Sequence, residues 1–331
     1  MKPWFAEVEL FGPSFEEARV STKSQRTRDF PLSDVGGWIR SERRTRKIDE
    51  EPRVLTPLHG RSATRRLPDC SFVQIKGCGW TWGPMRFWRS PKEEMTFGLF
   101  PESAARREVD VSSLIDTIFP AGAFTSVLGY AVIEAEEINL RTHATPTQTA
   151  YNNAEDQPAL LYTKCLSPIR VADLAFYSGA ERRNAVVQAC RVRSWIEAFY
   201  FREFSDRLAS TISALHDAGA VNDTLEPSNV TMAAEVTDFE WLFLPPFDTP
   251  DASGSHCLSA RQAKEVVYGL EVITHLCSFL LCDHLPWQLH FLREYIDRRQ
   301  TLVCFEIMEL LKGAVGGVAH PTLLPDGTEP L

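Results

Sequence analysis

Residues 215–240 read LHDAGAVNDTLEPSNVTMAAEVTDFE, and this stretch decides which fold the sequence predicts. A helix is expected to end at Asp217, because Gly219 can adopt the left-handed conformation that commonly stops a helix. A loop then closes on residues 227–229, Pro-Ser-Asn. The stretch therefore predicts a helix that delivers the chain into a polar loop.

Two short β-branched runs follow the loop, at residues 230–232 and 236–237, and the three residues between them complete the pattern of a hairpin. Such a hairpin returns the chain, so that Asn229 and Asp238 can face one another. An amide oxygen and a carboxylate are hard ligands of the kind that Mg²⁺ takes while it keeps waters and nucleotide phosphates. Asn229 and Asp238 are therefore candidate metal ligands, although both residue types are also common as simple turn formers.

The loop resembles the catalytic loop of protein kinases, HRDxxxxN, in which the Asp receives the proton of the substrate hydroxyl. Counted back from Asn229, the three HRD positions hold Asn222, Asp223 and Thr224. Thr224 therefore stands where a kinase has its base.

The same loop resembles that of the selenoprotein O family, pseudokinases that transfer AMP rather than phosphate. That family has an HGxLNTDN-like loop, which also lacks the catalytic Asp. Its DYG-like triplet is matched by residues 238–240, Asp-Phe-Glu, and the nine-residue step from Asn229 to this triplet is the same. The chain departs at Ser228, where the family has an Asp proposed as a base, because a hydroxyl is a poor base near neutral pH. Asp223 is the candidate replacement, with Glu226 as an alternative.

A second motif is the segment VQIKGCGW at residues 73–80. A Lys at the end of an apolar strand suits a phosphate clamp, and glycines after it let the backbone approach a ligand. The selenoprotein O family has a very similar LQLKGAG segment, whose Lys contacts nucleotide phosphate. The resemblance implies that Lys76 binds phosphate, with Gly77 and Gly79 beside it. Taken alone, a Lys at a strand end is most often simply exposed.

A kinase fold needs an acidic helix residue to hold this Lys in place. Residues 102–115 are helix-like and offer Glu102 and Glu108. A separation of six residues corresponds to about 120° around a helix axis, so only one of the two can easily face the strand. The family pattern RExxxSEA places the partner in the second acid, which selects Glu108.

A third motif, LLYTKCLSPIRVADLAF, covers residues 160–176. It resembles the family's MLMRVAPSxLRFGxFE segment, a strand leading into a turn that presents an arginine to the nucleotide. Arg170 matches that arginine, and Lys164 replaces the family's first arginine. A guanidinium binds two phosphate oxygens at once, whereas Lys164 would act only as a point charge. The alternative is an arginine that packs against its own turn.

Composition bounds the class of protein. The formal net charge of −9 gives no basic field for nucleic acid or an anionic membrane. The eight cysteines form no CxxC pair and the histidines form no metal-binding pattern, so neither a zinc site nor a disulfide scaffold is expected. The first ten residues contain acids and lack the apolar core of a signal peptide. The most apolar stretch, residues 266–282, is interrupted by Glu271 and His275, which is typical of a buried helix rather than a membrane span. We therefore expect a cytoplasmic protein.

The predicted secondary structure changes along the chain. The first 60 residues are irregular and carry a basic cluster, RSERRTRK at residues 40–47, and strand-like runs follow at residues 71–75 and 124–133. Helical patterns dominate later, at residues 184–218, 259–282 and 289–312. This order predicts an α+β, two-lobed protein-kinase-like fold. The expected parts are an N-terminal extension (1–60), a strand-rich N-lobe (61–158), a helical C-lobe (159–318) and a flexible tail (319–331).

Together with the resemblance, these motifs predict an ATP-dependent nucleotidyltransferase that uses Mg²⁺ or Mn²⁺. The acceptor of the AMP would be a hydroxyl of a small molecule or of a protein Ser, Thr or Tyr. No glycine-rich GxGxxG loop precedes Lys76, as an ordinary kinase would have. Two alternatives stay open: a phosphotransferase that acts on such hydroxyls, and a non-catalytic pseudokinase that binds partners.

Overall fold

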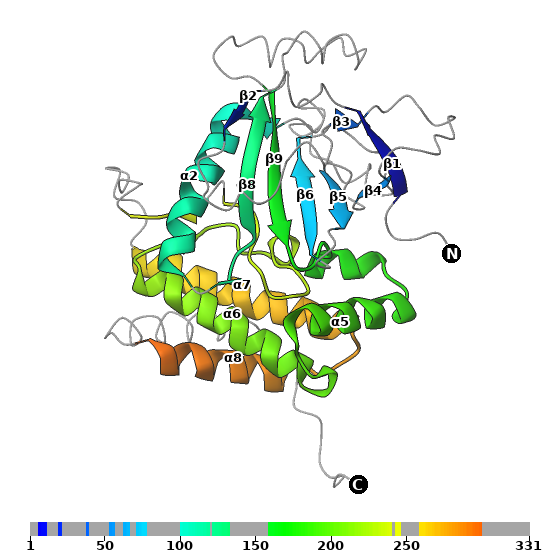
Figure 1. The fold of residues 1–331 in the computed structure, drawn as a ribbon. Coiled ribbons are helices and arrows are strands. Elements are labelled where there is room, and N and C mark those ends of the chain that lie inside the picture. The colour runs from blue at the N-terminus through cyan, green and yellow to red at the C-terminus, as the bar shows by residue number, and fades with distance from the viewer. Residues whose placement is uncertain are drawn as a thin grey trace, which may run out of the picture.

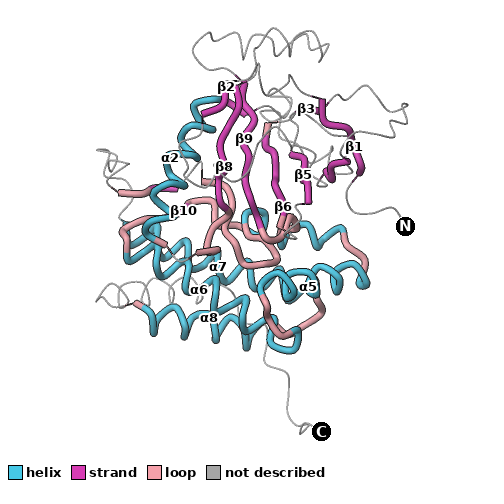
Figure 2. The backbone as a smooth tube through the Cα atoms, viewed as in Figure 1, coloured by secondary structure: helices cyan, strands magenta, loops and turns pink. Residues whose placement is uncertain are grey.

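The computed structural model of this chain consists of an antiparallel sheet and a separate group of helices (Figure 1), which Figure 2 shows by element type. The described residues are 6–11, 19–21, 38–39, 53–56, 62–66, 71–77, 100–119, 121–132, 158–239, 242–245 and 258–299. Gly79, the basic cluster at residues 40–47 and the expected tail lie outside them. The α+β class expected from the sequence is confirmed.

Within the described residues the main sheet has nine strands, and every pairing between them is antiparallel. The strands are β1 (Ala6–Phe11), β2 (Arg19–Ser21), β3 (Trp38–Ile39), β4 (Arg53–Thr56), β5 (Ser62–Arg66), β6 (Phe72–Lys76), β7 (Phe100–Pro101), β8 (Ser126–Val132) and β9 (Pro158–Cys165). Their order is β2-β8-β9-β6-β5-β4-β1-β3, with β7 paired to β9 outside this path. The central strands β6, β8 and β9 are rich in buried apolar side chains, which fixes their register.

Two differences from the sequence expectation concern this sheet. The first 60 residues, expected to be irregular, contribute β1 to β4. In addition, β9 pairs with both β6 and β8, so the strand-rich part runs to Cys165, beyond the boundary expected at residue 158.

Helix α2 (Glu102–Ile118) packs against the sheet beside β8 (Figure 1). Its buried residues include Ala105, Val109 and Ser112, a spacing of four and three that forms one face of a helix. The hydroxyl of Ser112 accepts a hydrogen bond of 3.2 Å from the backbone N–H of Val127 in β8. This contact and the apolar face fix the helix against the strand, and Glu108 lies on the same side.

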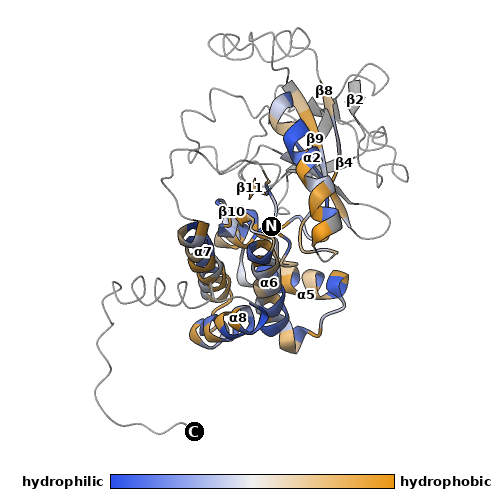
Figure 3. Ribbon diagram, turned by 90° about the vertical axis from the view of Figure 1, so that its left-hand side faces the viewer, coloured by the Kyte–Doolittle hydropathy of each residue, from blue (hydrophilic) through white to orange (hydrophobic). Residues whose placement is uncertain are grey.

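The remaining helices gather on the side of the molecule away from most of the sheet, as Figure 3 also shows. They are α5 (Gly179–Arg193), α6 (Tyr200–Asp217), α7 (Leu258–Phe279) and α8 (Leu285–Arg298). Helix α6 is central, and its buried apolar side chains recur every three or four residues: Phe204, Leu208, Ile212 and Leu215. Gly269 lets α7 pack closely against α6 and α8, because a Cβ at this position would lie 2.7 Å from the side chain of Phe291 and 2.9 Å from that of Ile212. Among the described residues, no helix is long and apolar enough to cross a membrane.

The single helix predicted over residues 184–218 is wrong. The chain forms α5 and α6 instead, separated by Ser194 in the left-handed conformation (φ 58°) and by a short 3-10 turn, Glu197–Phe199. The N–H of Trp195 bonds to the carbonyl of Cys190 at 2.9 Å, which closes the end of α5. Helix α5 stops at a serine and not at the usual glycine. The sequence therefore carries no glycine signal that would separate α5 from α6.

Candidate functional site

Lys76, the last residue of β6, is the centre of the candidate site. Its Nζ lies 2.9 Å from Oε1 of Glu108 on α2 and 3.3 Å from Oδ1 of Asp238, which follows the hairpin. The ammonium also lies 5.5 Å from the ring centroid of Phe100. Burial acts to lower the pKa of Lys76, but the negative charges of Asp238 and Glu108 outweigh it, and the pKa lies above its ordinary value. Lys76 is therefore a charged amine at neutral pH, held by two acids.

The pairing of Lys76 with Glu108 rather than Glu102 is as the sequence predicted. The Glu108 side chain is only 1% exposed, whereas Glu102 pairs with Arg106 on the solvent side of α2 at 2.7 Å. The roughly 120° between the two acids accounts for this division. An acid this deeply buried depends on its cationic partner, so Glu108 and Lys76 fix one another.

The hairpin predicted after the loop is present. An antiparallel bridge joins Val230 to Val236, and the N–H of Thr237 donates to the carbonyl of Asn229 at 2.8 Å. Asp238 then takes the left-handed conformation with φ 70°, which is uncommon for a residue other than glycine. This backbone conformation accompanies a carboxylate that reaches Lys76, and such exceptions cluster at functional sites.

Asn229, the other candidate metal ligand, is tied into the loop through both ends of its amide. Its Nδ2 donates to the carbonyl of Thr224 at 2.9 Å. Its Oδ1 accepts from Nη1 of Arg170 at 3.3 Å, and the same nitrogen donates to the carbonyl of Ser228 at 2.7 Å. Arg170 therefore reaches the loop, where its guanidinium donates hydrogen bonds to oxygens of the protein itself.

A short ladder positions Arg170 there. The N–H of Val171 donates to the carbonyl of Val230 at 2.9 Å, and the N–H of Met232 donates to the carbonyl of Ile169 at 2.8 Å. The positive charge of Arg170 also reaches Lys76, where, as the smallest of several influences, it acts to lower the pKa of the amine. The segment after β9 and the hairpin thus bring a second cation close to the cluster.

The structure does not bring Lys164 to this cluster. In the β6–β9 register Lys76 lies opposite Leu161, and Lys164 lies opposite Val73. Directly opposed residues share a face of the sheet and neighbours alternate, so Lys164 lies on the other face from Lys76. The register therefore gives no support to the expectation that both lysines contact one nucleotide.

Gly77 follows Lys76 with φ +84°. A Cβ at this position would overlap the carbonyl oxygen of Ala159 and lie 2.7 Å from Cβ of Phe100. The glycine is therefore required by the close approach of β7 and β9, and its role as a ligand-binding position remains a prediction.

Asp223, the candidate base, forms a two-point ion pair with Arg261 on α7. Nη2 lies 2.6 Å from Oδ2 and Nε lies 3.2 Å from Oδ1. Arg261 in turn covers the ring of Phe243 at 4.9 Å. Both carboxylate oxygens of Asp223 are thus engaged by a guanidinium, and the role of Asp223 as a base remains a prediction. The exposed Glu226 accepts a long hydrogen bond of 3.4 Å from the hydroxyl of Ser228.

Sequence reasoning missed Glu265 on α7, which holds the start of the loop. Its Oε1 accepts from the backbone N–H of Asn222 at 2.9 Å, and its Oε2 lies 2.6 Å from Nε2 of His216. Nδ1 of His216 lies 2.8 Å from the hydroxyl of Tyr295 on α8. Burial raises the pKa of Glu265, against the hydrogen bond from His216. The sequence did contain a signal for this residue. Glu265 lies four residues before Gly269, so both belong to the same, buried face of α7.

Glu235, in the hairpin turn, was also missed. Its buried carboxylate accepts from the backbone N–H groups of Leu166 at 2.8 Å and Ser167 at 3.4 Å, and from the hydroxyl of Thr231 at 3.3 Å. Burial raises the pKa of Glu235 to about 7, against the charge of Arg193 and these hydrogen bonds. The residue joins the hairpin to the segment that carries Arg170.

Two buried hydroxyls lie next to the cluster in the same part of the molecule. Thr163 shares the face of the sheet with Lys76, and Thr237 immediately precedes Asp238. Within the described part of the chain, neither Oγ1 has a hydrogen-bond partner.

Neither protein-family models nor curated proteins match this sequence.

Proposed function

We propose that this chain is a nucleotidyltransferase of two-lobed, protein-kinase-like fold that transfers AMP from ATP to a hydroxyl acceptor. The observation that carries the proposal is the position of the Lys76 amine between Glu108 and Asp238, which come from a helix and a loop distant in sequence. In kinases a strand Lys held by a helix Glu contacts nucleotide phosphates, and a loop Asp holds the metal. The resemblance of the KGCG and SPIR segments to selenoprotein O supports AMP transfer over phosphate transfer.

The order of elements supports the kinase-like assignment. An antiparallel sheet with one helix packed on it precedes a helical part, and the polar loop follows the central helix α6. The strand pair β10 (Val221–Asn222) and β11 (Leu242–Phe243) closes this loop. Hence Asn229 and Asp238 lie between the sheet and the helices, where a nucleotide would bind in such a fold.

The donor set fits a hard divalent cation. Asp238 supplies a carboxylate that is 24% exposed, and Asn229 supplies an amide oxygen. Mg²⁺ or Mn²⁺ uses few protein oxygens and completes its shell with water and phosphate. Arg170, now 3.3 Å from the Asn229 oxygen, would turn toward phosphate oxygens when a cation takes its place. A bound metal would neutralise phosphate charge.

The residues of the chain would act chiefly by positioning and by charge. Lys76 would neutralise phosphate oxygens, and Glu108 would keep the amine in place. Glu265 would hold the loop that carries Asn229. The position of the kinase base holds Thr224 instead of a carboxylate, which suits a transfer that relies on alignment and electrostatics.

One observation favours the alternative of a non-catalytic pseudokinase. Asp223 is paired with Arg261, and Asp238 is paired with Lys76, so each of these two candidate site acids has a cationic partner within the chain. A pseudokinase of this kind would use the fold to bind a partner. A phosphotransferase remains the other alternative.

Parallel incubations with ATP labelled at the α- or the γ-phosphate test the proposal, with Mg²⁺ and with the chain itself and a protein mixture as acceptors. Transfer of label from the α position alone is expected. Transfer from the γ position alone would replace the proposal with a phosphotransferase. Label from neither position would favour the non-catalytic pseudokinase.

A further inference from the structure

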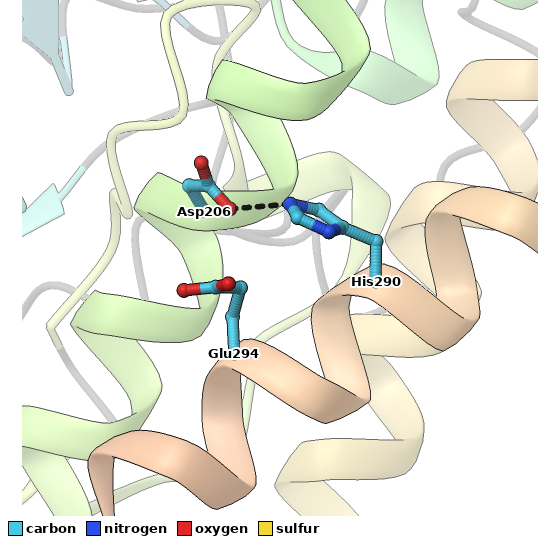
Figure 4. A group of neighbouring side chains, drawn as sticks. All are labelled: Asp206, His290 and Glu294. Atoms are coloured by element: carbon cyan, nitrogen blue, oxygen red, sulfur yellow. Dashed lines mark hydrogen bonds and ion pairs between the residues drawn. The ribbon is translucent and has the colours of Figure 1, made fainter.

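A second group of metal-ligating side chains lies between α6 and α8, away from the Lys76 cluster. Figure 4 shows Asp206 on α6 directed at His290 and Glu294 on α8. Nε2 of His290 lies 2.5 Å from Oδ1 of Asp206. One ligand atom from each of the three side chains lies within 4.8 Å of the others. All three side chains are partly exposed, at 24%, 27% and 29% for His290, Asp206 and Glu294.

The packing of the two helices positions this group. His290 and Glu294 are four residues apart, so they project from the same face of α8. On that helix Trp287 stacks on Phe201 of α6, with ring centroids 5.7 Å apart. Phe291 is fully buried. The apolar contacts therefore fix the spacing of the helices, and the three polar side chains gather at the partly exposed edge of that interface.

We propose that Asp206, His290 and Glu294 form a binding site for a divalent transition-metal ion, with Zn²⁺ as the best match. The inference is independent of the proposed nucleotide chemistry. One imidazole and two carboxylates are ligands that zinc takes at about 2.0–2.2 Å, with water in the remaining position. Mg²⁺ prefers an all-oxygen shell, so the imidazole separates this site from the candidate one at Asn229 and Asp238.

The geometry requires only small side-chain rotations. Ligand atoms around a tetrahedral zinc ion lie about 3.3 Å apart, since each bond is about 2 Å long. The 2.5 Å separation of Asp206 and His290 would open slightly, and the third atom, within 4.8 Å, would close in. A neutral imidazole and two carboxylates carry two negative charges, which the ion would balance.

The arginines near these carboxylates are weak competitors. Nε of Arg202 lies 3.9 Å from Asp206, and Nη2 of Arg298 lies 3.1 Å from Glu294. In each pair the two residues are partly exposed and lie four positions apart on their own helix, α6 for the first pair and α8 for the second. Such pairs contribute little to stability. A bound ion would therefore displace them at small cost and join α6 to α8.

Titration calorimetry of the full chain with Zn²⁺, in the absence of nucleotide, tests the site. We expect one ion per chain and a melting temperature that rises with zinc concentration. Asp206→Asn and His290→Ala should each weaken binding by at least about tenfold, because outer-shell changes alone reach that effect. Glu294→Gln serves as the third variant where a circular-dichroism spectrum shows that another variant has not folded.

His275 provides the matched control. It forms an i,i+4 pair with Glu271 on α7 at 3.7 Å, and the described residues give that pair no third ligand. His275→Ala should leave zinc binding unchanged. No binding of Zn²⁺ by the wild-type chain would overturn the proposal. So would zinc binding that is unaffected in folded variants of Asp206, His290 or Glu294.

Discussion

Lys76 and Glu108, which are 32 residues apart in sequence, form a buried ion pair of 2.9 Å between β6 and α2. Glu108→Gln should lower the free energy of unfolding by about 2–3 kcal/mol, because it leaves a buried ammonium with Asp238 as its remaining anion. Urea denaturation measures the change. Glu102→Gln is the matched control on the same helix, and its effect should stay within about 0.5 kcal/mol. Equal effects of the two variants would contradict the central position given to Glu108.

ATP should stabilise the chain only when a divalent metal is present. Thermal-shift measurements with ATP, alone and with Mg²⁺ or Mn²⁺, check this expectation. Asp238→Asn should abolish the metal-dependent shift while the protein stays folded, because asparagine tolerates the left-handed conformation. Asp223→Asn should keep the shift, since Asp223 is paired with Arg261. A shift that persists in folded Asp238→Asn would remove Asp238 from the metal site.

Glu265→Ala should destabilise the fold by about 3–5 kcal/mol, because it leaves His216 and the N–H of Asn222 without their buried acceptor. The measurement is again urea denaturation. Glu271→Ala, on the same helix but half-exposed, should change stability by no more than about 0.5 kcal/mol. A small effect at Glu265 would show that the loop is held by other contacts.

Local sequence was sufficient for the hairpin, whose determining pattern is two β-branched runs around a turn. For the partner of Lys76, the helical angle showed only that one of the two acids could easily face the strand, and the resemblance to the selenoprotein O pattern selected Glu108. The long-range partners could not be read in this way. Arg261 is 38 residues from Asp223, and Glu265 is 49 residues from His216.

Two differences between the sequence expectations and the structure have simple physical origins. The stop after α5 uses Ser194 in a conformation that sequence rules reserve mainly for glycine. Lys164 was matched by motif alone, but the face on which a strand residue lies depends on the register, and a change of one position reverses it. The approach of His290 to Asp206 could not be read from local sequence, because the two residues lie on different helices and are 84 residues apart.

Glu235 should give a pH-dependent contribution to stability. Its pKa in the folded chain is about 7, raised from 4.5, so the folded state retains the proton where the unfolded state has lost it. The stability associated with the protonated form is fully present below pH 4.5 and is lost as the pH rises toward 7. Its total size is about 3 kcal/mol from the difference in pKa.

Denaturation of wild type and Glu235→Gln across this pH range isolates the effect, since other titrating groups are common to both. The stability of wild type relative to the variant should fall between pH 4.5 and 7 and then level off. A difference between the two proteins that does not change with pH would show that Glu235 is not the titrating group.

The transfer of label from α-labelled ATP, compared between wild type and folded site variants, tests the central claim most directly. Wild type and Glu102→Gln should transfer label to an acceptor. Asp238→Asn should lose transfer, and Lys76→Ala should lose more in transfer than in ATP binding, because the amine chiefly stabilises the redistributed charge of the transition state. Transfer that proceeds undiminished in folded Lys76→Ala and Asp238→Asn proteins would contradict the assignment of this cluster as the active site.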